Sequence, residues 1–395
     1  MKLNKYINIC NLYILIWMLY NFHWSDVGAL FPVLDALSNV FLGINLLISA
    51  YCTIKVLARY PINSFFKGMN MLIVMFIIYG LISIVFGSDI PGLNKGSYLI
   101  GVLRTFLPIY TCFLFTKMGY LTEEAIRIWI PIFLIESIII YMSFRVVLDV
   151  GELYELRTNN RGYLFVTLFP FVYFFRNRSW LQYVFVAILI FFSIQSVKRG
   201  AILIIALATI CFFWHKLTSV SFLRKILVLM TLGIFVWIGS FFIGELYKES
   251  SVFQSRVEAT MEGNTSSRDV IAKGLLDKYT NADTFNFLFG FGADGTVRTG
   301  VFAHNDWLEM LFNQGPLGLV VFFVFWLNWF RLWRRQAVKN TDMAFLLGLL
   351  FICNFPKTLF SMWYSAANIF VTLPLGYCLA NIFVNDKKYI QESIT

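Results

Sequence analysis

One histidine lies where a long apolar stretch begins, and it is the residue of this chain best suited to proton transfer. His304 stands near the start of Ala303-His-Asn-Asp-Trp-Leu-Glu309, and the chain holds only two other histidines, His23 and His215. Imidazole can take up or deliver a proton near neutral pH, so His304 is a candidate general base. A helix beginning there would favour the neutral ring. The alternative is an interfacial histidine without a chemical role.

Three polar residues follow this histidine at once. Asn305, Asp306 and Glu309 are candidates for substrate binding, and the two carboxylates either orient His304 or satisfy the start of the helix. The pair Gly315-Pro316 predicts a break between a short surface helix over 305–314 and the membrane span that follows.

A second group consists of cations in segments that the topology places outside the cytoplasm. Guanidinium groups match phosphate oxygens with two parallel hydrogen bonds, so several cations converging at headgroup level suit a pyrophosphate. The alternative is that each side chain snorkels or pairs with a nearby carboxylate such as Glu152, Glu155 or Glu258. The group comprises Arg157, Arg161, Lys198, Arg199, Arg256, Arg268 and Arg298.

Apolar blocks must position these residues. The chain is 59% hydrophobic and only 14% charged, and a helix needs about 20 apolar residues to cross a bilayer. Strands of a barrel would alternate polar and apolar residues, and these blocks do not. We expect an all-α polytopic integral membrane protein with spans near 7–22, 29–52, 69–87, 97–116, 128–148, 163–175, 180–196, 200–215, 226–246, 306–330, 343–362 and 364–384.

The distribution of Lys and Arg orients these twelve predicted spans. Eighteen lie in the segments on one side and five in the short loops on the other, so the positive-inside rule puts both termini in the cytoplasm. The formal charge of +10 then follows largely from topology and anionic lipid, and nucleic-acid binding is not needed. Residues 1–246 would carry nine spans, 247–304 a large outside loop, 305–384 three spans and 385–395 a cytoplasmic tail.

The large loop is expected to contain at least one amphipathic helix. Ser266-Ser-Arg-Asp269 has the spacing of a capping box, and Ile271, Leu275 and Tyr279 fall on one face of the helix that would follow. The later Gly290-Phe-Gly-Ala-Asp-Gly295 fits a dinucleotide-binding pattern but lacks the surrounding βαβ unit. We interpret its glycines as flexible backbone near His304.

Neither a metal nor a cofactor is predicted. The six cysteines lie inside apolar blocks without metal-ligand spacing, and no Asp-x-Asp occurs. Ionisable residues within spans are functional candidates by default, although the two deepest, Arg104 and Lys357, could equally form structural pairs with Asp35 or Glu136. The candidates are Arg104, Arg145, Glu136 and Lys357.

Taken together, these motifs resemble the O-antigen polymerase and O-antigen ligase superfamily of Gram-negative bacteria. The resemblance covers mainly residues 157–330. It is carried by the late outside loop, Val197-Lys-Arg-Gly-Ala-Ile-Leu203, Ser266-Ser-Arg268, Gly290-Phe-Gly292, and His304-Asn305 followed by a short helix and Gly315-Pro-Leu-Gly318. It implies that Arg199, Arg268 and His304 take the places of the family's essential arginines and histidine at the periplasmic face of the bacterial inner membrane.

The resemblance also implies a reaction. An inverting, metal-independent transfer would move a glycan from undecaprenyl pyrophosphate to a hydroxyl of the next lipid-linked repeat unit. The ligase branch often has a second histidine where this chain has Phe302, which favours a polymerase. The arginine turn of ligases usually reads Ser-Arg-Gly, and in this chain Lys198 replaces the serine. The alternatives are a ligase acting on lipid A core and a flippase for the same lipid-linked unit. A chain-length regulator and a flippase are candidate protein partners.

Overall fold

The protein is described by a computed structural model that covers residues 8–23, 25–28, 30–87, 94, 96–148, 159–262, 268–339, 341–364 and 369–392. Within these ranges the chain forms helices and turns and no strand. The predicted all-α architecture of a membrane protein is therefore confirmed in outline.

Within the described ranges, eight helices are long and apolar enough to cross a membrane. Four shorter apolar helices coincide with the remaining predicted spans, and their crossing stays a prediction. The eight are α3 (Pro32–Arg59), α4 (Ser64–Phe86), α5 (Ser97–Lys117), α6 (Glu123–Leu148), α9 (Arg199–Ser219), α10 (Phe222–Glu249), α15 (Asp306–Val338) and α16 (Asp342–Phe360). The four are α1 (Ile9–Asn21), α7 with η2 (Gly162–Leu168 and Phe169–Phe175), α8 (Ser179–Gln195) and the apolar part Ile369–Phe383 of α17 (Ile369–Glu392).

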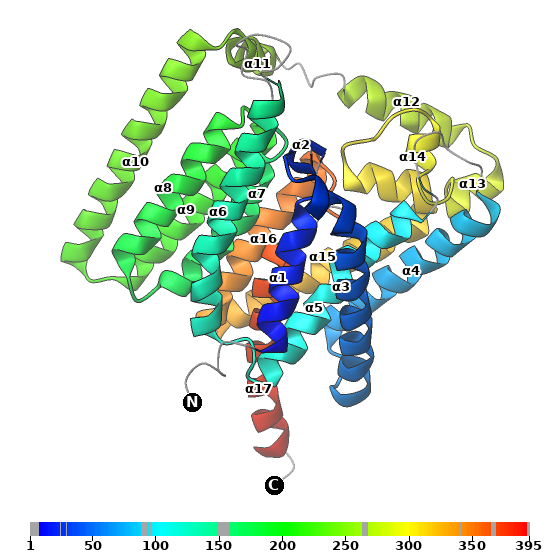
Figure 1. The fold of residues 1–395 in the computed structure, drawn as a ribbon, viewed down its shortest axis with the longest axis horizontal. Helices are drawn as coiled ribbons and strands as arrows, with labels where there is room; N and C mark the ends of the chain where they lie inside the picture. The colour runs from blue at the N-terminus through cyan, green and yellow to red at the C-terminus, as the bar shows by residue number, and fades with distance from the viewer. Residues whose placement is uncertain are drawn as a thin grey trace.

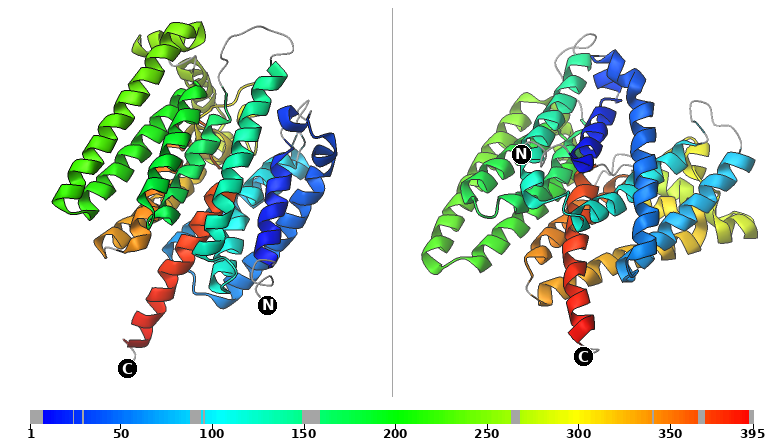
Figure 2. Two further views of the ribbon diagram at one scale, coloured as in Figure 1. Left: turned by 60° about the vertical axis from the view of Figure 1, so that its left-hand side comes forward. Right: turned by 60° about the horizontal axis from the view of Figure 1, so that its bottom comes forward.

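The predicted outside loop is largely helical. It contains α11 (Ser251–Met261), α12 (Arg268–Thr280), α13 (Thr284–Phe289) and α14 (Gly295–Arg298). Figure 1 shows α11, α12 and α14 toward the top of the molecule and the C-terminal end of α17 at the bottom. Figure 2 shows α8, α9 and α10 side by side at one flank. The loop helices therefore lie at the opposite end of the helical bundle from the last turns of α17.

Helix α15 is bent where the sequence predicts a break. Gly315 has φ 68° and ψ −168°, a backbone conformation outside the helical range, directly before Pro316. Beyond this kink, Trp326 and Trp329 stack with ring centroids 5.1 Å apart and are buried in the main apolar core. The core thus holds the second half of α15 in the bundle, while the kink turns its first half, 306–314, along the loop helices.

The intramembrane charges have partners other than those that the sequence suggested. Arg104 donates to the hydroxyl oxygen of Tyr20 at 2.6 Å, and Glu136 accepts from the side-chain amide of Asn21 at 3.1 Å. The ammonium of Lys357 lies 5.3 Å from the ring centroid of Tyr163. The side chain of Arg145 lies outside the described residues.

Candidate active site

His304 occupies a strained position at the start of α15. Its φ of 51° lies in the left-handed region, which histidine adopts uncommonly. The next residue, Asn305, caps the helix by accepting hydrogen bonds from the amides of Trp307 at 2.9 Å and Leu308 at 3.2 Å. The capped helix begins immediately after His304, whose side chain is exposed. Strain of this kind persists where the surroundings fix the backbone, and it is often found at functional sites.

The carboxylate of Glu309 fixes that backbone. It is 1% exposed and accepts from the hydroxyl of Thr296 at 2.6 Å, the amide of Ala303 at 2.9 Å and the side chain of Asn313 at 2.9 Å. One of these donors is the residue directly before His304. Glu309 therefore ties the loop to the first turn of α15 and positions His304 through its backbone.

Replacing Glu309 by alanine should therefore destabilise the protein. Three buried donors would lose their acceptor, and each unsatisfied group costs about 1–3 kcal/mol. We expect the midpoint of thermal unfolding of the purified protein to fall clearly in Glu309→Ala. Glu245→Ala, which removes a half-buried carboxylate that pairs with the exposed Lys248, should leave the midpoint nearly unchanged. Equal midpoints for the two variants would argue against the anchoring role.

Asp306 anchors the start of α15 to the segment that follows α16. One of its oxygens accepts from the amide of Trp363 at 2.8 Å, and its carboxylate interacts electrostatically with Lys357. The indole of Trp307 donates to the hydroxyl of Thr358 at 2.9 Å, which joins the same helix start to the end of α16. Among the described residues, neither Asp306 nor Glu309 hydrogen-bonds to His304, and the two carboxylates accept from the amides of Trp363 and Ala303 instead.

Cations occupy the first positions of three further helices. Arg161 is the residue before α7, Lys198 and Arg199 begin α9, and Arg268 begins α12. The positive end of a helix dipole lies at its N-terminus, so a cation there is unfavourable unless an anion balances it. At each of these three helix starts, the positive end of the helix dipole therefore adds to the positive charge of the Arg or Lys side chain.

Close backbone packing joins the starts of α7 and α9. The amide of Asn159 donates to the carbonyl oxygen of Ser196 at 2.9 Å. A Cβ on Gly162 would lie 2.3 Å from the hydroxyl oxygen of Ser196, so only glycine fits at this contact. Arg161 and Lys198, which lie next to these contacts in the chain, are therefore carried by two turns that touch.

The apolar face of α12 brings Arg268 to the same place. Leu275 and Tyr279 are buried against Ala303 and Phe312, which confirms the predicted amphipathic helix; its proposed capping residues 266–267 lie outside the described residues. This packing sets α12 over the segment that carries His304. Both Arg268 and Lys198 interact electrostatically with the imidazole of His304.

Tyr163 also lies next to these residues, although no motif in the sequence pointed to it. Its hydroxyl oxygen lies 2.3 Å from where a Cβ on Gly200 would be, and it interacts electrostatically with Arg268. The ammonium of Lys357, on α16, lies 5.3 Å from the centroid of its ring. Tyr163 thus lies against both the start of α9 and α16. The one sequence feature that could have identified Tyr163 is its position directly after Arg161-Gly162. This position belongs to no periodic pattern of apolar residues.

The pKa of His304 is lowered from its ordinary value of 6.5 by partial burial first, and then by the positive charges of Arg268 and Lys198. The neutral imidazole, which can accept a proton, is therefore the main form at neutral pH. Removing one of the cations should raise the pKa toward its ordinary value.

This shift predicts a pH-dependent change in reactivity. Diethyl pyrocarbonate modifies neutral imidazole, so the rate of His304 modification should fall as the pH drops through its lowered pKa. In Lys198→Met the midpoint should lie at higher pH, since one positive neighbour is gone. Mass spectrometry of the modified peptide separates His304 from the other histidines. Lys273→Met, which removes an exposed cation further along α12, serves as the control. Identical midpoints for Lys198→Met and the unsubstituted chain would contradict the electrostatic contact.

The remaining predicted site residues are placed differently. Arg298 donates to the hydroxyl of Ser83 at 3.0 Å, which connects α14 to α4. The side-chain amide of Asn305 donates to the carbonyl oxygen of Leu359 at 3.4 Å, in addition to its capping role. Arg157 lies outside the described residues, and Arg256 is on α11 with a side chain that is not described. Within the described ranges, no group of three or more His, Cys, Asp or Glu side chains could hold a metal ion.

Gly290 is tightly packed, in contrast to the expectation of flexible backbone, whereas a Cβ on Gly292 would meet no atom within 4 Å. The amides of Phe291 and Gly292 donate to the carbonyl oxygens of Phe312 and Asn313, both at 2.9 Å. A Cβ on Gly290 would lie 2.4 Å from the carbonyl of Asn313. Gly290 therefore allows the loop to approach the kink of α15 closely, and so it helps to fix the start of that helix.

Comparison with protein-family models gives no match to this chain, and comparison with curated proteins gives none either.

Proposed function

We propose that this protein is a membrane glycosyltransferase that joins polyprenyl-pyrophosphate-linked oligosaccharides. The observation that carries the proposal is that α12, which begins at Arg268, packs on the segment that carries His304, while Lys198 and Arg199 stand at the start of α9. The positive charges of Arg268 and Lys198 both lower the pKa of His304. A site with several cations and one neutral imidazole suits a reaction in which a phosphate-bearing group leaves and a hydroxyl loses a proton.

The proposed reaction is a single displacement at the anomeric carbon. The hydroxyl oxygen of the acceptor sugar forms a bond to that carbon while the bond to the pyrophosphate oxygen breaks. His304 takes the hydroxyl proton, and Arg199 and Arg268 stabilise the negative charge that develops on the departing pyrophosphate. Attack from the face opposite the leaving group inverts the anomeric configuration.

The identity of the acceptor rests on the resemblance to the O-antigen polymerase and ligase superfamily. We propose a polymerase, with the next lipid-linked repeat unit as acceptor, because Phe302 stands where the ligase branch often has histidine; its ring centroid lies 6.3 Å from that of His304. The outside of a bacterial inner membrane is the corresponding location, with both termini cytoplasmic. A ligase that uses lipid A core as acceptor is the nearest alternative outcome of the test.

Two experiments test this proposal. Purified protein in proteoliposomes should elongate a lipid-linked repeat unit when it receives only that unit as donor and acceptor; transfer to lipid A core alone would identify a ligase. In a deletion strain, one repeat unit on the core indicates a lost polymerase, and bare core indicates a lost ligase or flippase. If neither acceptor is glycosylated while the lipid-linked donor stays intact, and the deletion strain carries bare core, glycosyl transfer would be contradicted. This combination would favour a flippase.

A further inference from the structure

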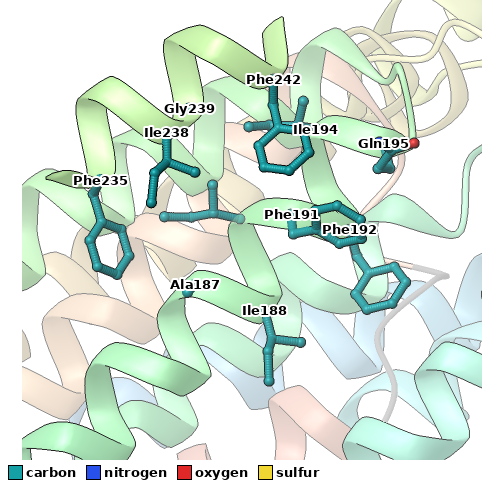
Figure 3. Close-up of a pocket in the computed structure, with 11 residues that line it drawn as sticks. Ala187, Ile188, Phe191, Phe192, Ile194, Gln195, Phe235, Ile238, Gly239 and Phe242 are labelled. Carbon is teal, nitrogen blue, oxygen red and sulfur yellow. The ribbon is translucent and has the colours of Figure 1, made fainter. Parts of the chain in front are cut away.

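An apolar groove of about 310 Å³ lies between α8 and α10. Phe191 and Ile194 line it from α8, and Phe235, Ile238 and Phe242 line it from α10 (Figure 3). Gln195, the last residue of α8, is its one polar lining residue. Such a groove at membrane depth accommodates a hydrocarbon chain but offers almost no hydrogen-bonding group to a polar ligand.

Helix α10 is well suited to leave space for such a chain. Only Val228 and Leu246 are buried along its 28 residues, so most of its surface is available to lipid. At Gly239, in the middle of the groove, an added Cβ would meet no atom within 4 Å. Part of the α8–α10 contact is therefore open, in contrast to the close packing at the starts of α7 and α9.

The groove ends next to the cations of the proposed site. Helix α8 ends at Gln195, and Lys198 and Arg199 follow after a turn of two residues. Val197 of this turn has φ 53° and is buried with Ile194 and with Leu246 of α10, which fixes the turn on the end of the groove. The groove residues from 187 to 195 span about 12 Å of helix, which is close to the depth of one hydrocarbon leaflet.

We infer that the α8–α10 groove holds the isoprenoid chain of the lipid-linked substrate, with the pyrophosphate at Lys198 and Arg199. This inference rests on the proposed function. An apolar groove that leads to two adjacent cations matches a molecule with one hydrocarbon chain and two phosphates. A phospholipid has two chains and one phosphate and matches this arrangement less well.

Filling the groove should weaken substrate binding without changing the chemistry. In Gly239→Phe the new ring would enter open space, so the fold should tolerate it. We expect the KM for the lipid-linked donor to rise about tenfold with kcat unchanged, since lost burial of a few methylene groups has an effect of this size. Gly233→Phe is the matched control, because Gly233 is on the same helix, also has open space, and does not line the groove. Equal KM values for the two variants would overturn the inference.

A binding measurement keeps the test independent of turnover. The probe is polyprenyl pyrophosphate with a photoreactive group in the isoprenoid chain, incubated with the full chain in phosphatidylethanolamine–phosphatidylglycerol vesicles. Labelled peptides should come from α8 and α10, and excess unlabelled polyprenyl pyrophosphate should suppress the labelling whereas excess phosphatidylglycerol should not. Equal suppression by phosphatidylglycerol, or labelling elsewhere in an active protein, would overturn the inference. Specific labelling of the groove in a protein without transferase activity would instead contradict the proposed function alone.

Discussion

His304→Ala should reduce glycan polymerisation by about 10²–10⁴-fold, the range over which a general base contributes to catalysis. The expected loss lies in kcat, because the imidazole acts on the hydroxyl proton as the new bond forms, and the KM of the donor should change little. The measurement is the initial rate of chain elongation by purified protein in proteoliposomes, at equal protein content, over a range of donor concentrations.

A second variant at this position separates chemistry from backbone strain. Asparagine tolerates the left-handed backbone conformation of residue 304 better than most residues, so His304→Asn should fold as well as the unsubstituted chain. It should nevertheless be as inactive as His304→Ala. Elongation at the normal rate in either variant would disprove the assignment of His304 as the base. His215→Asn, which alters a histidine at the far end of α9, is the matched control and should remain active.

Arg268→Ala should lower the rate of elongation by about 10²–10³-fold, as expected when one group that stabilises the developing charge is removed. Arg268→Lys should recover only part of this loss, because an ammonium cannot form two parallel hydrogen bonds to phosphate oxygens. The same rate assay measures both variants. Lys273→Ala removes an exposed cation from the same helix and should have little effect.

Inhibition by inorganic pyrophosphate provides a separate readout for this arginine. Pyrophosphate should compete with the lipid-linked donor in the unsubstituted chain, and its inhibition constant should rise in Arg268→Ala. A merely structural arginine would leave the inhibition constant unchanged while it lowered the amount of folded protein. Unaltered inhibition together with unaltered elongation in Arg268→Ala would exclude the proposed contact with the leaving group.

The helices of this protein can be predicted well from the sequence, because their apolar residues occur in continuous blocks. The block 226–246 falls within α10, and 97–116 coincides with α5 to within one residue. The break at Gly315-Pro316 was also predictable, since proline removes an amide and glycine allows a positive φ. Crossing of the four short helices, such as α1, depends on tilt and local bilayer thickness, which no residue pattern specifies.

The candidate site was predictable as a set of residue types but not as an arrangement. Lys198 and Arg268 both interact with His304, although they are separated from it by 106 and 36 residues. Their approach depends on the packing of α12 and of the α8–α9 turn, which is determined by side-chain shape in three dimensions. The anchoring role of Glu309 was not predictable for the same reason, because its donors Thr296 and Ala303 precede it by 13 and 6 residues and are brought to it by the packing of α14 and of the turn before α15.

All six cysteines are free thiols, and five of them are buried within the helices while Cys211 is partly buried. A charged maleimide reagent that cannot pass the bilayer needs a thiol in water, so the native chain should give almost no background labelling. A single cysteine introduced at an exposed position of α12, for example in place of Lys273, would then report on its own which side of the membrane that helix faces. The sidedness of the loop can thus be measured without first removing the native thiols and disturbing the apolar packing around them.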